Sequence, residues 1–306
     1  MIFLIIIIIL IFILNFSYTN LVIKNKLQYR TNIDYESQFK YNKDINYIII
    51  GDSHAHQSIN PKYLEESYNL GFSANSYIPN FYKLNNLIYN NHVKVKYLII
   101  EIDPTSFSNG LNNTNAIRED LWYYSKIMDL NQLSILLKEK KIKLWILTKF
   151  PFIGNGKDFF FQKKSETYKG FLKYDKQFDD MNKTYISNIR VNQLFPPNSK
   201  MDELSIEYYK NILKLAQDNN ISVILIKYPH TLEFNQQILS HNISLDEYYN
   251  QINKITKENI KEFYLLDYYN YSLDSTLFAD SDHLNYKGAE AFTNILKEDL
   301  IKNGLT

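Results

Sequence analysis

The stretch "YIIIGDSHAHQSINP", residues 47–61, is an apolar run that stops abruptly at Gly-Asp-Ser-His. A short apolar run that ends at a glycine is typical of a buried strand. In open parallel sheets, reactive groups gather at the carboxyl ends of the strands, where loops meet helix N-termini. Ser53 follows the run directly and is therefore the first candidate for a catalytic nucleophile.

Outward from this stretch, the chain alternates short apolar runs with longer helical patterns, which is typical of parallel βαβ units. Strands are predicted at residues 46–51, 95–103, 142–148, 221–228 and 263–266. Helices are predicted at residues 80–91, 131–139, 202–219, 245–258 and 286–303. We therefore expect an α/β fold, a three-layer α/β/α sandwich around a central, mostly parallel sheet. Residues 104–200 fit this pattern least well and predict an insertion over the carboxyl edge of the sheet.

Composition excludes several classes of protein. The 306 residues, 45% of them hydrophobic, suffice for one large α/β domain with an appendage or for two small domains. The formal net charge of +1 gives no global field of the kind that nucleic-acid binding needs, so we expect no nucleic-acid partner. Cysteine is absent, which excludes disulfides, thiolate metal sites and a cysteine nucleophile. The chemistry must therefore rest on oxygen and nitrogen.

The N-terminal segment from Ile2 to Ile23 carries no charged residue. As a helix it would measure roughly 33 Å, enough to cross a hydrocarbon core of about 30 Å. A cleaved signal peptide is the alternative, but no small-x-small cleavage motif follows the segment. We expect a retained transmembrane anchor at 2–23, a linker at 24–43 and the main domain at 44–306. Basic residues after the segment favour a cytoplasmic domain, but long domains are translocated largely regardless of charge, and we favour the extracytoplasmic side of the cell membrane.

A partner for Ser53 lies near the other end of the chain, in "FADSDHLNYKGAEAFT", residues 278–293. A nucleophilic serine needs a base that takes its proton and an acid that orients the base. Asp280 and His283 are three residues apart, and on a turn this spacing lets the carboxylate reach one imidazole nitrogen while the other faces outward. Asp282 is adjacent to His283 and is expected to point elsewhere. The motif thus offers Ser53 both a base and an orienting acid.

The two motifs resemble the first and last sequence blocks of the SGNH/GDSL hydrolase family. "GDSH" stands near the start of the domain and "DSDH" stands before the final helix, so the resemblance covers the layout of residues 46–303. In that family the first-block serine attacks an acyl carbonyl and a D-x-x-H pair supplies base and orienting acid, which implies Ser53, His283 and Asp280 here. The longer string "GDSHAHQSINPKYLEESYNLGFSANSY" further resembles a membrane-anchored bacterial branch of the family. The implied fold is SGNH-hydrolase-like or flavodoxin-like.

The oxyanion hole is where the sequence departs from the family pattern. The family takes one donor from the serine's own backbone N–H and a second from a glycine, which "NLGFSANS" replaces by Ala74; a backbone donor survives that change. The third donor is an asparagine side chain, but "YLIIEIDPTSFSN" has Pro104, Thr105 and Ser106 where it is expected. Losing one such donor costs about 2.7 to 4 kcal/mol of transition-state stabilisation. Thr105 and Asn75 are the candidates to substitute, since Asn75 follows Ala74 directly and carries an amide.

Each candidate also has a purely structural interpretation. Ser53 could act only as a helix N-cap, His283 as a histidine bonded to a loop carbonyl, and Asp280 as a turn residue. His54 and His56 are expected to be solvated or to contact neighbouring loops, and we leave them outside the triad.

A metal pair is a further alternative at the end of the second strand. Glu101 and Asp103 alternate with Ile102 there, but no histidine lies nearby. We therefore expect no metal site and no organic cofactor.

The sequence thus predicts a membrane-anchored serine esterase or O-acyltransferase that acts on acyl esters. Hydrolysis and transfer both remain open, since either water or an acceptor hydroxyl can resolve an acyl-enzyme. The resemblance implies an acylated small molecule or a cell-surface polysaccharide as substrate, and it allows a membrane acyltransferase as partner. The alternative is a non-catalytic binding or assembly protein of a cell-envelope polysaccharide system, which kept the fold but lost the oxyanion hole. The missing asparagine supports this alternative, whereas a complete Ser-His-Asp set argues against it.

Overall fold

The computed structural model describes residues 2–23, 43–108, 114–155, 167–178, 182–196, 200–241, 243–271 and 273–306. The chain divides into two compact units. The smaller unit combines Met1–Asp34 with Thr114–Glu166, and the larger unit combines Tyr35–Asn113 with Thr167–Thr306. Apart from residue 43, the predicted linker lies outside the described residues.

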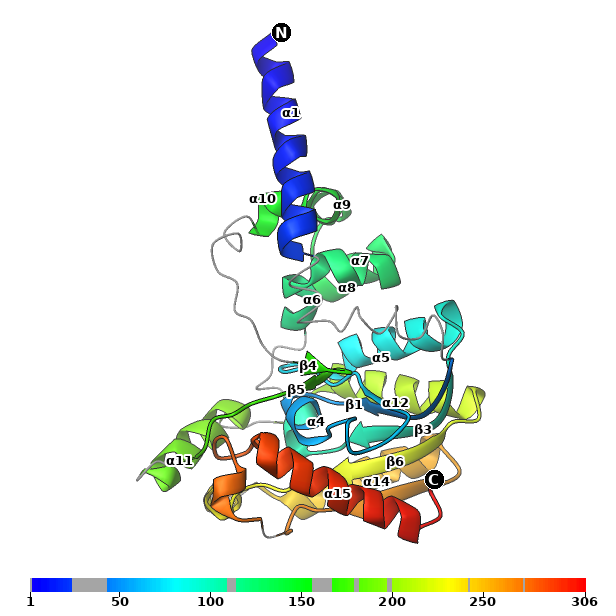
Figure 1. Ribbon diagram of the computed structural model, residues 1–306, viewed down its shortest axis with the longest axis vertical. Coiled ribbons are helices and arrows are strands. Elements are labelled where there is room, and N and C mark those ends of the chain that lie inside the picture. The colour runs from blue at the N-terminus through cyan, green and yellow to red at the C-terminus, as the bar shows by residue number, and fades with distance from the viewer. Residues whose placement is uncertain are drawn as a thin grey trace. The chain divides into compact units, whose positions relative to one another are not determined.

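The larger unit is built on a parallel sheet of five strands (Figure 1). Its order is β2 (Ser67–Asn69), β1 (Asp44–Ile50), β3 (Lys94–Glu101), β6 (Ser222–Lys227) and β7 (Phe263–Asp267), and every neighbouring pair is parallel. The central strands are aliphatic runs, because helices cover both faces of such a sheet and leave no polar face. This flavodoxin-like order reverses between β1 and β3, which makes the carboxyl ends of these two strands the expected site of a ligand. The predicted α/β fold with a parallel sheet is confirmed.

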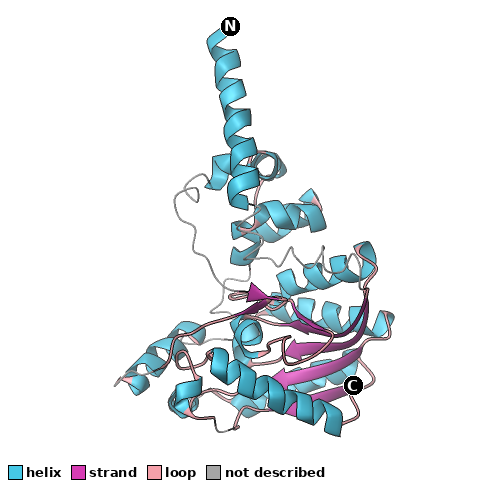
Figure 2. Cartoon of the chain, viewed as in Figure 1, coloured by secondary structure: helices cyan, strands magenta, loops and turns pink. Residues whose placement is uncertain are grey.

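Helices flank both faces of this sheet (Figure 2). On one face, α5 (Tyr77–Asn85) packs against α12 (Glu203–Asp218), which packs against α14 (Leu245–Asn259). On the other face, α4 (Ser53–Ser58) packs against α15 (Tyr286–Lys302). Apolar residues spaced three or four apart give each long helix one buried side; in α15 they are Phe292, Leu296 and Leu300, which join Ile49, Ile99 and Ile224 of the strands in one core.

The remaining elements of the larger unit connect these layers. They are η2 (Asn86–Asn90), η3 (Pro104–Phe107), β4 (Thr167–Tyr168) paired with β5 (Phe171–Leu172), α11 (Lys183–Leu194), α13 (Leu232–Ser240) and η5 (Ser275–Leu277). The segment that lacks the expected asparagine forms η3, a short 3-10 turn with Pro104 at its start. Its residues therefore stand at the carboxyl end of β3.

The smaller unit is helical in its described part. It contains α1 (Ile2–Ser17), the π-helical turn η1 (Tyr18–Ile23), α6 (Asn115–Glu119), α7 (Leu121–Ile127), α8 (Leu130–Leu137), α9 (Lys141–Lys149) and α10 (Pro151–Asn155). The Phe12 and Phe150 rings pack edge to face with centroids 5.7 Å apart, and Asn15 Nδ2 donates to the Lys149 carbonyl at 3.1 Å. Among the described residues, none of the helices has both the length and the apolar character that a membrane crossing requires.

The predicted strand at 142–148 is wrong, because these residues form α9. The periodicity of a short apolar run does not distinguish a strand from a helical segment. Leu144 is buried, whereas Ile142 and Trp145 are 63% and 44% exposed. The run therefore buries only one of its sides, whereas a central parallel strand has both of its faces buried. Strand β2 was not predicted, because Ser-Tyr-Asn is too short and too polar to show a pattern.

Candidate active site

Ser53 begins α4 directly after β1, at the sheet edge where the strand order reverses. Asp52, not Ser53, is the N-cap, and its carboxylate accepts the backbone N–H of His54 at 2.8 Å. Gly51 is needed between strand and helix, because a Cβ at this position would overlap the buried Glu101 carboxylate. The strand, the glycine and the helix together place Ser53 at the carboxyl edge of the sheet.

The structure brings the three predicted catalytic residues together. Ser53 Oγ lies 2.7 Å from His283 Nε2, and His283 Nδ1 lies 2.9 and 3.1 Å from the two carboxylate oxygens of Asp280. Asp280 Oδ1 also accepts the backbone N–H groups of residues 282 and 283, at 3.1 and 2.9 Å, which fixes its carboxylate in the turn before α15. With Nδ1–H donating to Asp280, Nε2 can accept the Ser53 proton. This is the geometry of a nucleophile, a base and an orienting acid.

Asp282 does not point away from the site, contrary to the sequence prediction. Its side chain is buried and accepts two contacts from Arg190 Nε, at 3.1 and 2.9 Å. Its Oδ2 lies 3.4 Å from His54 Nε2, and its Oδ1 lies 3.6 Å from His283 Nδ1. Burial by itself raises the pKa of Asp282, but the charges of His283 and Arg190 hold it well below its usual range. The turn closed by Asp280 directs residue 282 inward, which sequence spacing alone does not show.

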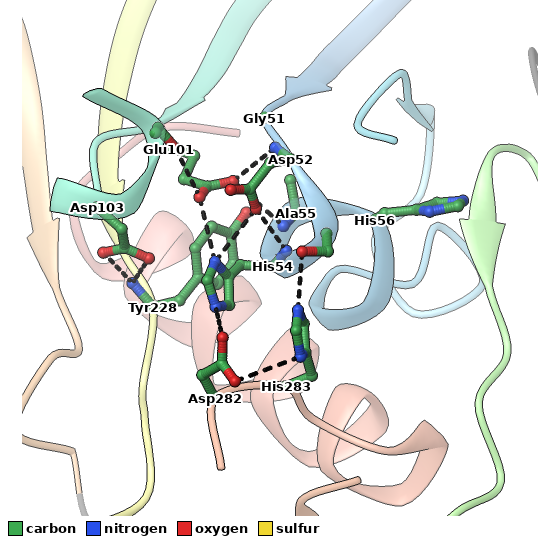
Figure 3. Close-up of polar contacts among 12 residues, drawn as sticks. Gly51, Asp52, His54, Ala55, His56, Glu101, Asp103, Tyr228, Asp282 and His283 are labelled. Atoms are coloured by element: carbon green, nitrogen blue, oxygen red, sulfur yellow. Dashed lines mark hydrogen bonds and ion pairs between the residues drawn. The ribbon is translucent and has the colours of Figure 1, made fainter. Parts of the chain in front are cut away.

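His54 is buried, contrary to the expectation that it is solvated. Its Nδ1 lies 3.1 Å from Asp52 Oδ1 and 3.3 Å from Glu101 Oε1, and its Nε2 faces Asp282 (Figure 3). Burial alone would lower the pKa of His54, but these three carboxylates raise it well above its usual value. The three carboxylates around its ring thus favour the protonated, positively charged form of His54.

His56 is also buried, and it contacts the loop that follows β2, with its Nδ1 3.2 Å from Ser73 Oγ. Burial, together with the Lys83 ammonium, lowers the pKa of His56 to about 3, so its ring is neutral. In Figure 3 the His56 ring points away from His54 and His283. It thus stays outside the candidate triad.

Glu101 ends β3 and is completely buried. Its Oε2 accepts the backbone N–H of Asp52 at 2.8 Å, and its Oε1 accepts the Ser106 hydroxyl at 2.9 Å. Burial and the neighbouring Asp52 charge raise the pKa of Glu101 to about 6. Burial alone would raise the pKa of Asp52, but the charge and hydrogen bonds of His54 lower it to about 2. Because it accepts the backbone N–H of Asp52, Glu101 fixes the turn that carries Ser53.

Asp103 and His230 extend this cluster. Asp103 accepts the Tyr228 backbone N–H with both oxygens, at 3.2 and 3.3 Å, and burial with the Glu101 charge raises the pKa of Asp103 well above its usual value. His230 Nε2 lies 3.8 Å from Asp103 Oδ2, and burial with the His54 charge lowers the pKa of His230 to about 3. The expectation that no histidine lies near Glu101 and Asp103 is therefore wrong.

Three groups of described side chains are close enough to offer ligand atoms to a metal ion: His54 with Asp282 and His283, His54 with Asp103 and His230, and His54 with Asp52 and Glu101. All three depend on His54. Both ring nitrogens of His54 already face carboxylates, which is the arrangement of an ion-paired imidazole. We therefore interpret the cluster as an ion-pair network.

The predicted oxyanion-hole residues lie in the loops after β2 and β3. Phe72 N donates to the Gly51 carbonyl at 3.3 Å, so the first loop lies beside the turn that carries Ser53. Ala74 adopts a left-handed φ of 60°, a conformation that favours glycine. Asn75 is 1% exposed, and in the described part of the chain neither polar atom of its amide has a hydrogen-bond partner. The buried Thr105 hydroxyl also has no partner there.

No family model matches the chain, and no curated protein matches it. Among solved structures, it is similar to a proposed acylhydrolase from Bacteroides fragilis, with 13% sequence identity and a TM-score of 0.38 over 90% of this chain and 98% of the other. It is also similar to a GDSL-like lipase from Bacteroides thetaiotaomicron, with 10% identity and a TM-score of 0.38 over 94% of this chain and 98% of the other. Both similarities are distant, and the candidate site rests on the geometry of this chain.

Proposed function

We propose that the chain is a serine esterase or O-acyltransferase of the SGNH type, with Ser53 as nucleophile, His283 as base and Asp280 as orienting acid. The observation that carries the proposal is the unbroken series of contacts from Ser53 Oγ through the His283 ring to Asp280, at 2.7 and 2.9 Å. The structural alternative for Ser53 loses its support, because Asp52 caps α4. A nucleophile, its base and an orienting acid are what acyl transfer through a serine ester requires.

In the first half-reaction, the Ser53 hydroxyl attacks an acyl carbonyl while its proton passes to His283 Nε2. The tetrahedral intermediate collapses when the ester C–O bond breaks, and His283 returns the proton to the leaving alcohol. An acyl-Ser53 ester remains. In the second half-reaction, water or an acceptor hydroxyl attacks this ester and gives its proton to His283. The bond between the acyl carbon and Ser53 Oγ then breaks, and His283 returns the proton to Ser53. Water yields a carboxylic acid and a sugar hydroxyl yields a new ester, while Asp280 stabilises each imidazolium.

The proposal is tested by covalent labelling of the full-length chain with a fluorophosphonate, which reacts with activated serines. We expect one label, at Ser53, and complete loss of labelling in Ser53→Ala. Ser240→Ala, which removes an exposed serine at the end of α13, is the control and keeps full labelling. Labelling that persists in Ser53→Ala, or its absence from the folded wild-type chain, contradicts the catalytic proposal.

The oxyanion hole is proposed to combine the backbone N–H groups of Ser53 and Ala74 with the side-chain amide of Asn75. A buried amide without a partner is costly unless a ligand supplies one, and Asn75 has such an amide. Thr105 is the second candidate for the side-chain donor, because its buried hydroxyl is also without a partner among the described residues.

Asn75→Ala is expected to lower kcat about 10²- to 10³-fold, which is the effect of removing one oxyanion donor. Hydrolysis of p-nitrophenyl acetate by the full-length chain measures kcat, and Thr105→Val tests the second candidate in the same assay. Asn294→Ala replaces an exposed asparagine on α15 and is the matched control. A wild-type kcat in Asn75→Ala would exclude Asn75 from the oxyanion hole.

A non-catalytic binding or assembly protein of a cell-envelope polysaccharide system is the second candidate function. It is favoured by one observation, that Pro104, Thr105 and Ser106 form η3 where the family has its donor asparagine. This candidate predicts no fluorophosphonate label and a retained affinity for the polysaccharide.

Neither α1 nor η1 alone is long enough to cross a membrane, but η1 continues directly from α1, and we propose that residues 2–23 together anchor the chain in a cell membrane, with the larger unit on the extracytoplasmic side. Phe3, Phe12 and Phe16 of α1 are 77%, 58% and 72% exposed, and a helix that is apolar all round needs apolar surroundings. On that side of the membrane, the substrate would be an acylated small molecule or a surface polysaccharide. If the reaction is transfer, a membrane acyltransferase would be the partner that supplies acyl groups.

Alkaline phosphatase fused after Thr306 is expected to be active, because this enzyme functions only outside the cytoplasm, and the fusion is expected to resist extraction from membranes by alkaline carbonate. A reporter that functions only in the cytoplasm should be inactive at the same position. The reverse pattern of reporter activity would place the larger unit in the cytoplasm, and a soluble mature form that starts near Asn20 would identify a cleaved signal peptide.

A further inference from the structure

The triad does not use the ion-pair network around His54, yet the network contacts the triad directly. The His54 ring stacks on the His283 ring, with centroids 4.9 Å apart and planes inclined by 18°. Figure 3 shows His54 between Asp52 and Glu101 on one side and Asp282 on the other. Because the proposed base must be unprotonated to act, the charge of this network bears on catalysis.

We propose that His54 is a positioning residue, whose buried ring among three carboxylates offsets the negative charge beside His283 and so favours the form of that base that accepts the serine proton. This inference rests on the proposed role of His283 as the catalytic base. His54 itself does not touch the reacting atoms and acts through its effect on His283.

The charges around the two histidines show why an offset is needed. The groups that face them are the acids Asp52, Glu101, Asp280, Asp282 and Asp103, the cation Arg190, and the uncharged Ser53, Tyr228 and His230. Burial and the Glu101 charge raise the pKa of Asp103 well above its usual value, which favours its neutral form, so Asp103 is left out of the charge balance. Without the His54 charge, four carboxylates would face a single guanidinium. Negative charge within a few ångströms favours a protonated imidazole, which cannot accept the serine proton.

The geometry also gives the Asp282 carboxylate two partners other than His283. Arg190 Nε holds it from one side at 2.9 Å, and His54 Nε2 faces it from another at 3.4 Å. Asp282 consequently stays 3.6 Å from His283 Nδ1, while Asp280 keeps the 2.9 Å contact. The His54 side chain is almost completely buried, so solvent ions screen its charge very little.

The test is the rate of fluorophosphonate labelling of Ser53 as a function of pH in the full-length chain. His54→Gln keeps an amide that can bond the carboxylates but removes the charge, so the acid limb of the profile is expected to move to higher pH by about 1 unit or more. Asp282→Asn removes one negative charge and is expected to move the limb to lower pH. Rates that fall equally at every pH, with the limb in place, would indicate a merely structural role and would overturn the proposal.

Two further variants serve as a rescue and a control. The double variant His54→Gln/Glu101→Gln removes one charge of each sign and should return the limb toward its wild-type position. His92→Gln removes an exposed imidazole and should not move the limb. A limb that stays shifted in the double variant would contradict an effect of charge balance.

The protonation state of His54 can also be read without catalysis. In ¹⁵N NMR of the histidine-labelled wild-type chain, the His54 ring, assigned through its contacts with His283, is expected to be doubly protonated at pH 7. A neutral His54 ring at pH 7 overturns the inference even if no variant folds. Absence of Ser53 labelling in the wild type would instead contradict the proposed function, and the NMR result would still decide the charge of His54.

Discussion

Replacing His283 by alanine is expected to lower turnover nearly as far as replacing Ser53, by about 10⁵- to 10⁶-fold. His283 Nε2 lies 2.7 Å from Ser53 Oγ, and a serine without its base is a poor nucleophile at neutral pH. Neighbouring imidazoles are not placed to take over, because both nitrogens of His54 face carboxylates and the His56 ring points away (Figure 3). The measurement is kcat for p-nitrophenyl acetate with the full-length chain.

The double variant Ser53→Ala/His283→Ala is expected to lose no more than either single variant, because members of a triad act as a unit. His241→Ala removes a part-exposed imidazole at the end of α13 and should keep wild-type turnover. If the two single losses multiplied in the double variant, Ser53 and His283 would act independently, which contradicts the proposed triad.

The sheet could be predicted from the sequence because each of its longer strands is a continuous apolar run between turns. Residues 47–50 of β1, 97–100 of β3 and 223–226 of β6 are buried, and all of them are apolar or aromatic, as a sheet covered on both faces requires. The run at 142–148 has a similar composition, yet it forms α9, where only one side is covered. Local composition does not report how many sides of an element are covered, since neighbours in space decide this.

The contacts among Ser53, His283 and Asp280 could be predicted because each of the two motifs carries its own geometry. A glycine turn after a strand presents the serine, and a D-x-x-H turn before a helix places a carboxylate against a ring nitrogen. The ion-pair network could not be predicted in this way, since His54, Glu101 and Asp282 come from three distant segments and Arg190 comes from the region that fitted no pattern. The one local signal is a glutamate, Glu101, directly after the buried apolar run 97–100.

Asp280→Asn is expected to lower kcat by up to about 10⁴-fold, because it favours the wrong tautomer of His283. In the wild-type chain, the backbone N–H groups of residues 282 and 283 donate to Asp280 Oδ1 at 3.1 and 2.9 Å. The side-chain oxygen of the introduced asparagine can accept the same two groups, so the turn keeps its shape. The new amide nitrogen then faces His283 Nδ1 as a donor. The ring proton moves to Nε2, which can no longer take the proton of Ser53.

The control for this experiment follows from the structure rather than from the sequence. The adjacent residue Asp282 is unsuitable as the control position, because it is buried against Arg190 and His54. Glu298→Gln removes an equal charge from the exposed side of α15 and should leave kcat within a few fold of wild type. Asp282→Asn should shift the pH dependence but retain most of the turnover at its own optimum. If it instead lowered kcat at that optimum further than Asp280→Asn does, Asp282 would be the orienting acid, and its 3.6 Å separation from His283 Nδ1 would have to close during the reaction.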